Sequence, residues 1–215
     1  MATRSATLLL LVLCVAVVAL DPPIWPDSFD VAFDETFIVN NVSHHVNGIY
    51  YYDAAHNRSR LDRFDGIYSR FCSSLAENDS TPCTELVVNQ SRWIIYPQKS
   101  QCCFCCDSAH GCGILKKDWL KGADYLGDEI IDGSNYNKWN QQGVVGYNHY
   151  WSSTDGFNVP RRLDENGGHI FDYIIKSYSE KPLDAKIFAL PQYCKDPCPD
   201  TSFCGKHRAV EYAEE

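Results

Sequence analysis

Five of the eleven cysteines of this 215-residue chain lie within residues 101–112, QCCFCCDSAHGC. Thiolates at such short spacings can bind a metal ion, take part in redox exchange or pair as disulfides. The compartment of the protein decides among these chemistries, because disulfides persist mainly in oxidising environments.

The N-terminus has the features of a secretory signal peptide. Arg4 is the only charged residue in 1–19, an apolar run covers 8–18, and the residues up to Ala19 have the small-residue spacing that signal peptidase requires. The run is shorter than the ~20 residues of a membrane span, and the sequence DPPIWP, which no helix would cross, follows it. We therefore expect residues 1–19 to be removed, leaving residues 20–215 as one secreted domain without a transmembrane segment. An uncleaved signal anchor is the alternative.

Two further features agree with secretion. Loss of the leader removes Cys14 and leaves ten cysteines, an even number that indicates a disulfide framework. Four sequons for N-glycosylation are present, at Asn41, Asn57, Asn78 and Asn89. We expect a disulfide-bonded glycoprotein in the extracellular space or the endomembrane lumen.

The cysteine-rich segment is expected to be extended, with successive side chains on opposite faces. Cys103 and Cys105 would share one face, and Cys102 and Cys106 the other. A bridge between adjacent cysteines would be strained, so the four are expected to take four different partners. Six cysteines are available for them, of which the last two would pair together: Cys72, Cys83, Cys112, Cys194, Cys198 and Cys204.

On this hypothesis the segment is a staple. It would join the middle of the chain to the hairpin around 72–83 and to the cysteine-rich tail at about 194–215. A zinc site is one alternative, with Cys102 and Cys105, or Cys103 and Cys106, joined by Cys194 and Cys198. A thioredoxin-type redox motif is another, although no βαβ pattern surrounds the cysteines.

Alternating apolar residues predict a mainly β fold. In residues 29–39, FDVAFDETFIV, the apolar side chains fall on alternate positions, which is typical of a half-buried strand. Residues 48–66 indicate an aromatic strand, a turn at 53–57 and a return strand. The other segments expected to be strands are 84–97, 168–179 and 185–191. Residues 116–127 could form a helical turn or two with Asp118 as N-cap, and "NGGH" at 166–169 fits a hairpin turn.

Acidic residues are concentrated in one stretch of the chain, and they are Asp118, Asp124, Asp128, Glu129 and Asp132. A solvated surface is the simplest interpretation. Weak calcium binding by Asp124, Asp128 and Asp132 is a second, although the EF-hand spacing is missing. A third is a glycan-acting hydrolase or transferase that uses these acids, with Trp119, Trp139 and Trp151 as sugar platforms.

The overall charge argues against two classes of partner. The formal net charge of −9 becomes −10 when Arg4 is removed with the leader, which argues against nucleic acid and against anionic lipid headgroups as main partners. The histidines lack metal-ligand spacing and the serines lack a nucleophile elbow, so no motif names a reaction.

Several short motifs between residues 25 and 200 resemble the secreted ependymin-related, LolA-like families. They are Cys112-Gly113, Asp118-Trp119-Leu120, Gly122-Ala123, Tyr125-Leu126-Gly127, Asp132-Gly133, Asn137-Lys138-Trp139, "TDG…PRR" and "FALPxYC". The resemblance implies a curled antiparallel sheet, a LolA-like half-barrel with a few short helices, whose apolar concave face holds a lipid. It implies no catalytic residue, and for several ependymin-related proteins an association with calcium or extracellular matrix. The "CCFCC" segment and the tail "CPDTSFC" depart from the family pattern and leave the disulfide pairing open.

These observations favour a non-enzymatic protein that binds a hydrophobic small molecule or lipid in an apolar cavity. The 13 tyrosines, 10 phenylalanines and 5 tryptophans could line such a cavity. The glycan-acting enzyme and an extracellular matrix or adhesion protein stay open as alternatives. No cofactor is expected other than calcium.

Overall fold

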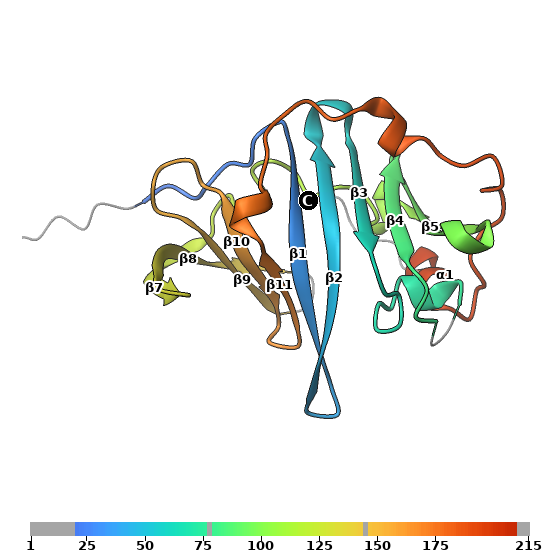
Figure 1. Ribbon diagram of the computed structural model, residues 1–215, viewed down its shortest axis with the longest axis horizontal. Helices are drawn as coiled ribbons and strands as arrows, with labels where there is room; N and C mark the ends of the chain where they lie inside the picture. Colours follow the sequence, from blue (N-terminus) through green and yellow to red (C-terminus); the bar gives the residue numbers. More distant parts are fainter. Residues whose placement is uncertain (1–19, 77–78, 144–145, 210–215) are drawn as a thin grey trace, which may run out of the picture.

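The computed structural model describes residues 20–76, 79–143 and 146–209, and its strands form one open, curled antiparallel sheet. The expected leader, residues 1–19, and the sequon at Asn78 lie outside the described residues. The eleven strands of the described residues follow the order β6-β5-β4-β3-β2-β1-β11-β10-β9-β8-β7 (Figure 1). Their bounds are β1 Ser28–Val39, β2 Val42–Asp53, β3 Arg58–Arg63, β4 Cys83–Val88, β5 Ser91–Tyr96, β6 Gln101–Asp107, β7 Asp124–Ile131, β8 Ser134–Gln142, β9 Tyr147–Ser153, β10 Pro160–Glu165 and β11 His169–Tyr173. This confirms the expected fold class.

The long hairpin of β1 and β2 forms the middle of the sheet, and its tip projects beyond the other strands (Figure 1). Asn40 and Asn41 form the tip, with φ angles of 51° and 61°. Asparagine tolerates this left-handed conformation better than most residues, so the two-residue turn is encoded locally.

The two faces of the sheet follow from strict alternation along β1. Phe29, Val31, Phe33, Glu35 and Phe37 are all buried, and the residues between them are half-buried. Phe29, Val31 and Phe33 pack in a core with aromatic side chains from β2, β8, β9 and β11, and Phe37 stacks on the ring of His169. This is the concave face of the sheet, and the predicted period of two is confirmed.

A single connection joins the two edges of the sheet. Since β6 and β7 lie at opposite edges, the residues between them must cross the whole sheet. Residues 111–123, the crossing segment, do this over the concave face. The backbone carbonyl of Lys117 accepts from Trp25 N at 2.9 Å, and that of Leu115 accepts from the Tyr52 hydroxyl at 2.8 Å.

The cysteine-rich segment is the edge strand β6, and a β-bulge changes its expected alternation. The register with β5 shifts between Arg92 and Trp93, so that Cys105 is the extra residue. Cys103, Cys105 and Cys106 therefore all pack in one buried cluster with Ile94 and Tyr96, whereas Cys102 packs on the other face. The expectation that Cys106 would share a face with Cys102 was wrong because of this bulge.

The ten cysteines of the described residues form five disulfides. These are Cys72–Cys83, Cys102–Cys194, Cys103–Cys198, Cys105–Cys204 and Cys106–Cys112. The four cysteines of the CCFCC run take four different partners, as the spacing favoured. The expected staple to the 72–83 hairpin is absent from this pairing, because Cys72 and Cys83 bond to each other.

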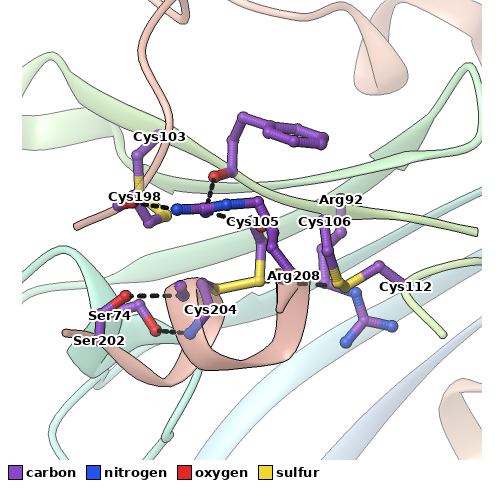
Figure 2. Close-up of a disulfide and its surroundings, with 12 residues drawn as sticks. Ser74, Arg92, Cys103, Cys105, Cys106, Cys112, Cys198, Ser202, Cys204 and Arg208 are labelled. Atoms are coloured by element: carbon purple, nitrogen blue, oxygen red, sulfur yellow. Dashed lines mark hydrogen bonds between the residues drawn. A yellow bond between two sulfur atoms is a disulfide. The ribbon is translucent and has the colours of Figure 1, made fainter. Parts of the chain in front are cut away.

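Three disulfides, Cys102–Cys194, Cys103–Cys198 and Cys105–Cys204, fasten the C-terminal tail to β6. After η6 (Ala185–Phe188) the tail reaches the sheet edge, where Phe104 N donates to Asp196 O and Cys198 N to Phe104 O, both at 2.8 Å. The short helix α1 (Phe203–Arg208) follows, and Figure 2 shows the Cys105–Cys204 disulfide that holds it. Arg208 at its end donates to the carbonyls of Phe104 and Cys105, at 3.1 and 2.9 Å. It thereby satisfies carbonyls at the bulge.

Other sequence-based expectations were only partly met. Residues 84–97 contain two strands, β4 and β5, because Asn89 and Gln90 take up positive φ angles and form a turn. Residues 185–191 begin with the 3-10 turn η6 instead of a strand, and of 168–179 only β11 is a strand. The expected hairpin turn near 166–169 joins β10 to β11. Of the residues 116–127 expected to form a helical turn or two, 117–122 form turns without a helix and 124–127 belong to β7.

Candidate ligand-binding site

A cavity of about 2000 Å³ lies between the concave face and the crossing segment. Aromatic side chains from many elements line it, and they are Trp25, Phe37, Tyr50, Tyr52, Tyr68, Phe71, Phe171, Tyr173 and Phe203. Aliphatic side chains from β3, β4, β10 and the crossing segment add to this lining. Polar and charged side chains also line the space. A concave, largely apolar space with polar groups that can orient a ligand is the usual form of a small-molecule site.

The N-terminal segment and the crossing segment wall one side of this cavity. Trp25 is 1% exposed, donates from Nε1 to the Tyr150 hydroxyl at 2.9 Å, and packs edge-on against Trp119 with ring centroids 5.7 Å apart. Leu120 beside it is fully buried. The crossing segment is thus fixed to the sheet by packed aromatic rings, and the cavity lies beside it along β3, β4, β10 and β11.

A buried ion cluster lies in the floor of the cavity. Arg63 of β3 donates to Glu35 of β1, from Nε to Oε2 at 2.5 Å and from Nη2 to Oε1 at 2.8 Å, and its Nη1 donates to Glu85 of β4. His169 of β11 contacts Glu35 at 2.5 Å through Nε2 and Glu165 at 2.9 Å through Nδ1. Glu35 is 0% and Arg63 3% exposed. Charges buried this deeply are stable only when they are paired and hydrogen-bonded.

The pKa values in this cluster shift in favour of the charged forms. Burial alone would lower the pKa of His169, but its hydrogen bonds to Glu165 and Glu35 raise that pKa to about 9. Burial would raise the pKa of Glu35, yet the charge and hydrogen bonds of Arg63 hold it below its usual value. His169 is therefore a cation at neutral pH and is unsuited to act as a general base.

This buried ion cluster was not predicted from the sequence, although one residue of the sequence indicates it. Glu35 occupies the apolar phase of an otherwise regular alternating strand. A charged residue in such a position must find a buried partner, and it points to a polar site within the core. Its partners come from strands distant in sequence, so they could not be named from the pattern.

The cavity has a basic end beside α1. Arg92 lies over the ring of Phe71 at 4.4 Å, and Arg70 lies over the ring of Phe203 at 5.0 Å. Lys206 and His207 of α1 line the same space. Burial lowers the pKa of His207, and the charges of Arg92 and Arg70 lower it further. This end of the cavity is therefore positively charged.

The family of the chain follows from its sequence. Residues 24–194 match a family model described as a domain of unknown function, DUF8395. The chain belongs to the DUF8395 family. No curated protein matches it.

Solved structures similar to this DUF8395 domain are distant in sequence. An uncharacterized conserved protein from Thermus thermophilus shares 7% identity, with 77% of this chain and 86% of that chain covered and a TM-score of 0.48. A LolA superfamily protein from Nitrosomonas europaea shares 14% identity, with 76% and 90% covered and a TM-score of 0.39. A DUF1329 family protein from Desulfovibrio piger shares 9% identity, with 76% and 90% covered and a TM-score of 0.35. The LolA-like part of the expected resemblance thus recurs among the structural neighbours, whereas the ependymin-related part finds no support in them.

The acidic residues between 118 and 132 take separate partners or lie exposed in the DUF8395 domain. Asp132 pairs with Arg161 at 2.6 Å, Glu129 pairs with Lys138 at 2.9 Å, and Asp128 accepts from Tyr125 and Asn135. Asp118 and Asp124 are exposed. Because β7 is an edge strand, its carboxylates spread over solvated surface. The structure gives no support to the expected calcium site at Asp124, Asp128 and Asp132.

The tryptophans expected as sugar platforms are packed inside the domain. Trp139 is 1% and Trp151 4% exposed, and Trp119 packs against Trp25 and Tyr150. A platform must present its ring to a sugar, so these residues serve the core. Within the described residues, the one group of three metal-ligand side chains is Cys105, Cys106 and Cys112, and all three are bonded in disulfides. The zinc alternative therefore has no thiolates available.

Three sequons lie within the described residues. Asn41, Asn57 and Asn89 are exposed, and each occupies a turn with a φ angle of 51–61°. No helix of the described residues is long and apolar enough to span a membrane.

Proposed function

We propose that this protein binds a small molecule with a large apolar part in the cavity on its concave face. One observation carries the proposal: a cavity of about 2000 Å³ is lined by aromatic side chains from both halves of the sheet. A fully packed core would have closed this space. Instead, inward-facing side chains of β3, β4, β10 and β11 border an open space.

The apolar lining gives the driving force for binding. Burial of apolar ligand surface contributes roughly 25 cal/mol per Å², and Tyr, Phe and Trp offer large areas at little loss of side-chain entropy. The disulfides and the aromatic packing hold the walls in place, so that little ordering is needed when the ligand enters.

A neutral apolar fluorophore tests the proposal directly. N-phenyl-1-naphthylamine is expected to bind with increased emission, and 1-dodecanol is expected to displace it. The variant Leu61→Trp places an indole in the cavity from β3 and should abolish the signal, because Leu61 lines the space. Ile49→Trp on β2 is the matched control, since its neighbours Gly48 and Tyr50 face inward and Ile49 therefore faces outward. Fluorophore binding that survives Leu61→Trp unchanged would place the ligand elsewhere.

We further propose that the protein is secreted and glycosylated, a second proposal that the leader sequence, the even number of cysteines and the exposed sequons support. Expression in a secreting eukaryotic cell should give protein in the medium that loses mass on treatment with an N-glycosidase. Retention of all the protein in the cytosol would contradict the proposal. Replacement of Asn41, Asn57 or Asn89 by Gln should each remove one step of the mass shift.

A further inference from the structure

The charges that line the cavity oppose the charge of the whole protein. The chain carries 28 acidic and 19 basic residues, yet six basic residues and three acidic ones line the cavity. The basic ones are Arg63, Arg70, Arg92, Lys116, Lys117 and Lys206, and the acidic ones are Glu85, Asp118 and Glu165. A positive cavity in an acidic protein points to an anionic ligand, because focused charge raises the local concentration of the opposite charge.

The surplus of positive charge is located at the basic end. The three carboxylates of the buried ion cluster make their short contacts within that cluster: Glu35 and Glu85 with Arg63, and Glu165 with His169. The guanidinium of Arg92 makes only long hydrogen bonds. Nη1 donates to Glu85 at 3.3 Å, and Nη2 donates to the carbonyl of Gly113 at 3.5 Å. Arg70 lies 3.9 Å from Glu165, and its side chain is 63% exposed. Within the described residues, no carboxylate is paired with Lys206.

The same end offers apolar rings beside the charges. The rings of Phe71 and Phe203 meet edge-on with centroids 5.0 Å apart, and each lies under an arginine. The Cys105–Cys204 disulfide and the hydrogen bond from Cys204 N to Ser74 Oγ, at 3.0 Å, fix α1 in this place. Arg92 is paired across the sheet with Cys106, next to the same group of bridges (Figure 2). The disulfides thus hold three cations at one end of an aromatic cavity.

We infer that the ligand is an anionic amphiphile, whose carboxylate or phosphate headgroup binds Arg70, Arg92 and Lys206 and whose apolar part lies on the aromatic lining. This inference rests on the proposed function. Guanidinium groups donate paired hydrogen bonds to both kinds of headgroup, and Lys206 adds a point charge. From these cations the aromatic lining continues toward β1 and β11. A small anion would occupy only the basic end, so the ligand must also have a long apolar part.

The test compares ligands that differ only in the headgroup. Dodecanoate, dodecyl phosphate and 1-dodecanol share one chain length, and acetate and inorganic phosphate supply headgroups alone. Displacement of N-phenyl-1-naphthylamine gives an affinity for each. We expect the two anionic amphiphiles to bind at least about tenfold more tightly than the alcohol, and the preference to weaken as salt is raised. Acetate and phosphate should displace nothing.

Variants locate the effect at the basic end. The double variant Arg70→Gln/Lys206→Gln changes two exposed residues and should bring dodecanoate and dodecanol to nearly equal affinity, with dodecanol unchanged. Lys121→Gln is the control, since Lys121 is exposed and does not line the cavity. Equal affinities of the acid and the alcohol for the unaltered protein would overturn the inference and leave the proposed function intact. Displacement by phosphate or acetate alone would also overturn it. Absence of binding by the fluorophore and by every dodecyl compound would refute the proposed function itself.

Discussion

Arg63 and Glu35 form a two-pronged ion pair at the centre of the sheet, with both side chains shielded from solvent. The pair joins β3 to β1 across β2, where Gly48 lies opposite Arg63 on one side and Phe33 on the other. Glu85 and His169 complete the cluster from the two halves of the sheet. Its loss is therefore expected to affect both the stability of the fold and the floor of the cavity.

Replacement of Arg63 should strongly destabilise the protein. Arg63→Met leaves Glu35 and Glu85 buried without a cation that bridges them, and we expect the free energy of unfolding to fall by about 3–5 kcal/mol. Urea denaturation measures this. Arg60→Gln on the outer face of the same strand is the control; Arg60 pairs with the half-exposed Asp62, so its replacement should cost under about 1 kcal/mol. Equal losses of unfolding free energy in the two variants would show that the buried cluster stabilises the fold no more than an ion pair on the outer face does.

The stability should depend on pH through His169. Since folding raises its pKa from 6.5 to about 9, its contribution is fully present below pH 6.5 and is lost as the pH rises through 9. The difference in the free energy of unfolding between the wild type and His169→Gln should therefore be at most about 3 kcal/mol at pH 6, and should shrink toward pH 10. A difference that stays constant from pH 6 to 10 would contradict the assignment.

The three bridges between β6 and the tail should be mutually redundant. Each closes a long loop, with sequence separations of 92, 95 and 99 residues. Removing only Cys102–Cys194 by double Ser substitution opens a small additional loop, because the other two bridges still hold the segments together. We expect a loss of about 2 kcal/mol from one removal, because only a small loop is freed. Removal of all three should cost more than three times that loss, because only then is a long loop freed as well, and a total equal to the sum of the single losses would contradict the redundancy.

Peptide mapping without reduction checks the pairing on which this expectation depends. Peptides that carry residues 102–106 should be linked to the tail peptides and to the peptide with Cys112, and Cys72 should be linked to Cys83. A link between Cys72 or Cys83 and residues 102–106 would contradict the structure.

Gly48 should tolerate no side chain. A Cβ atom placed there would lie about 2.2 Å from the carbonyl oxygen of Asp62 and 2.3 Å from Cζ of Phe33. Gly48→Ala must displace backbone or the core ring, so we expect a loss of about 1–3 kcal/mol and a lower melting temperature. Gly168→Ala is the matched control, because a Cβ atom at that position would have no neighbour within 4 Å. A neutral Gly48→Ala would show that the strands there are looser than the structure indicates.

The sequence by itself determined the β-rich class, the alternation of β1, the turn at 166–169 and the presence of a disulfide framework. These features are local: a period of two, residues that accept positive φ, and a count of cysteines each act within a few positions. The departures from expectation have equally specific causes. The alternation in residues 102–106 fails at a bulge that depends on the register with β5, and residues 84–97 divide at a two-residue turn.

Only the tertiary structure decided the site. Glu35, Arg63, Glu85 and His169 come from four strands, and the order of the sheet brings them together although up to 134 residues separate contacting partners. The cavity exists because the connection from β6 to β7 must cross the concave face and covers only part of it. Its basic end depends on disulfides that carry α1 to the sheet edge. Such placements follow from the pairing of distant segments, which no local pattern of residues encodes.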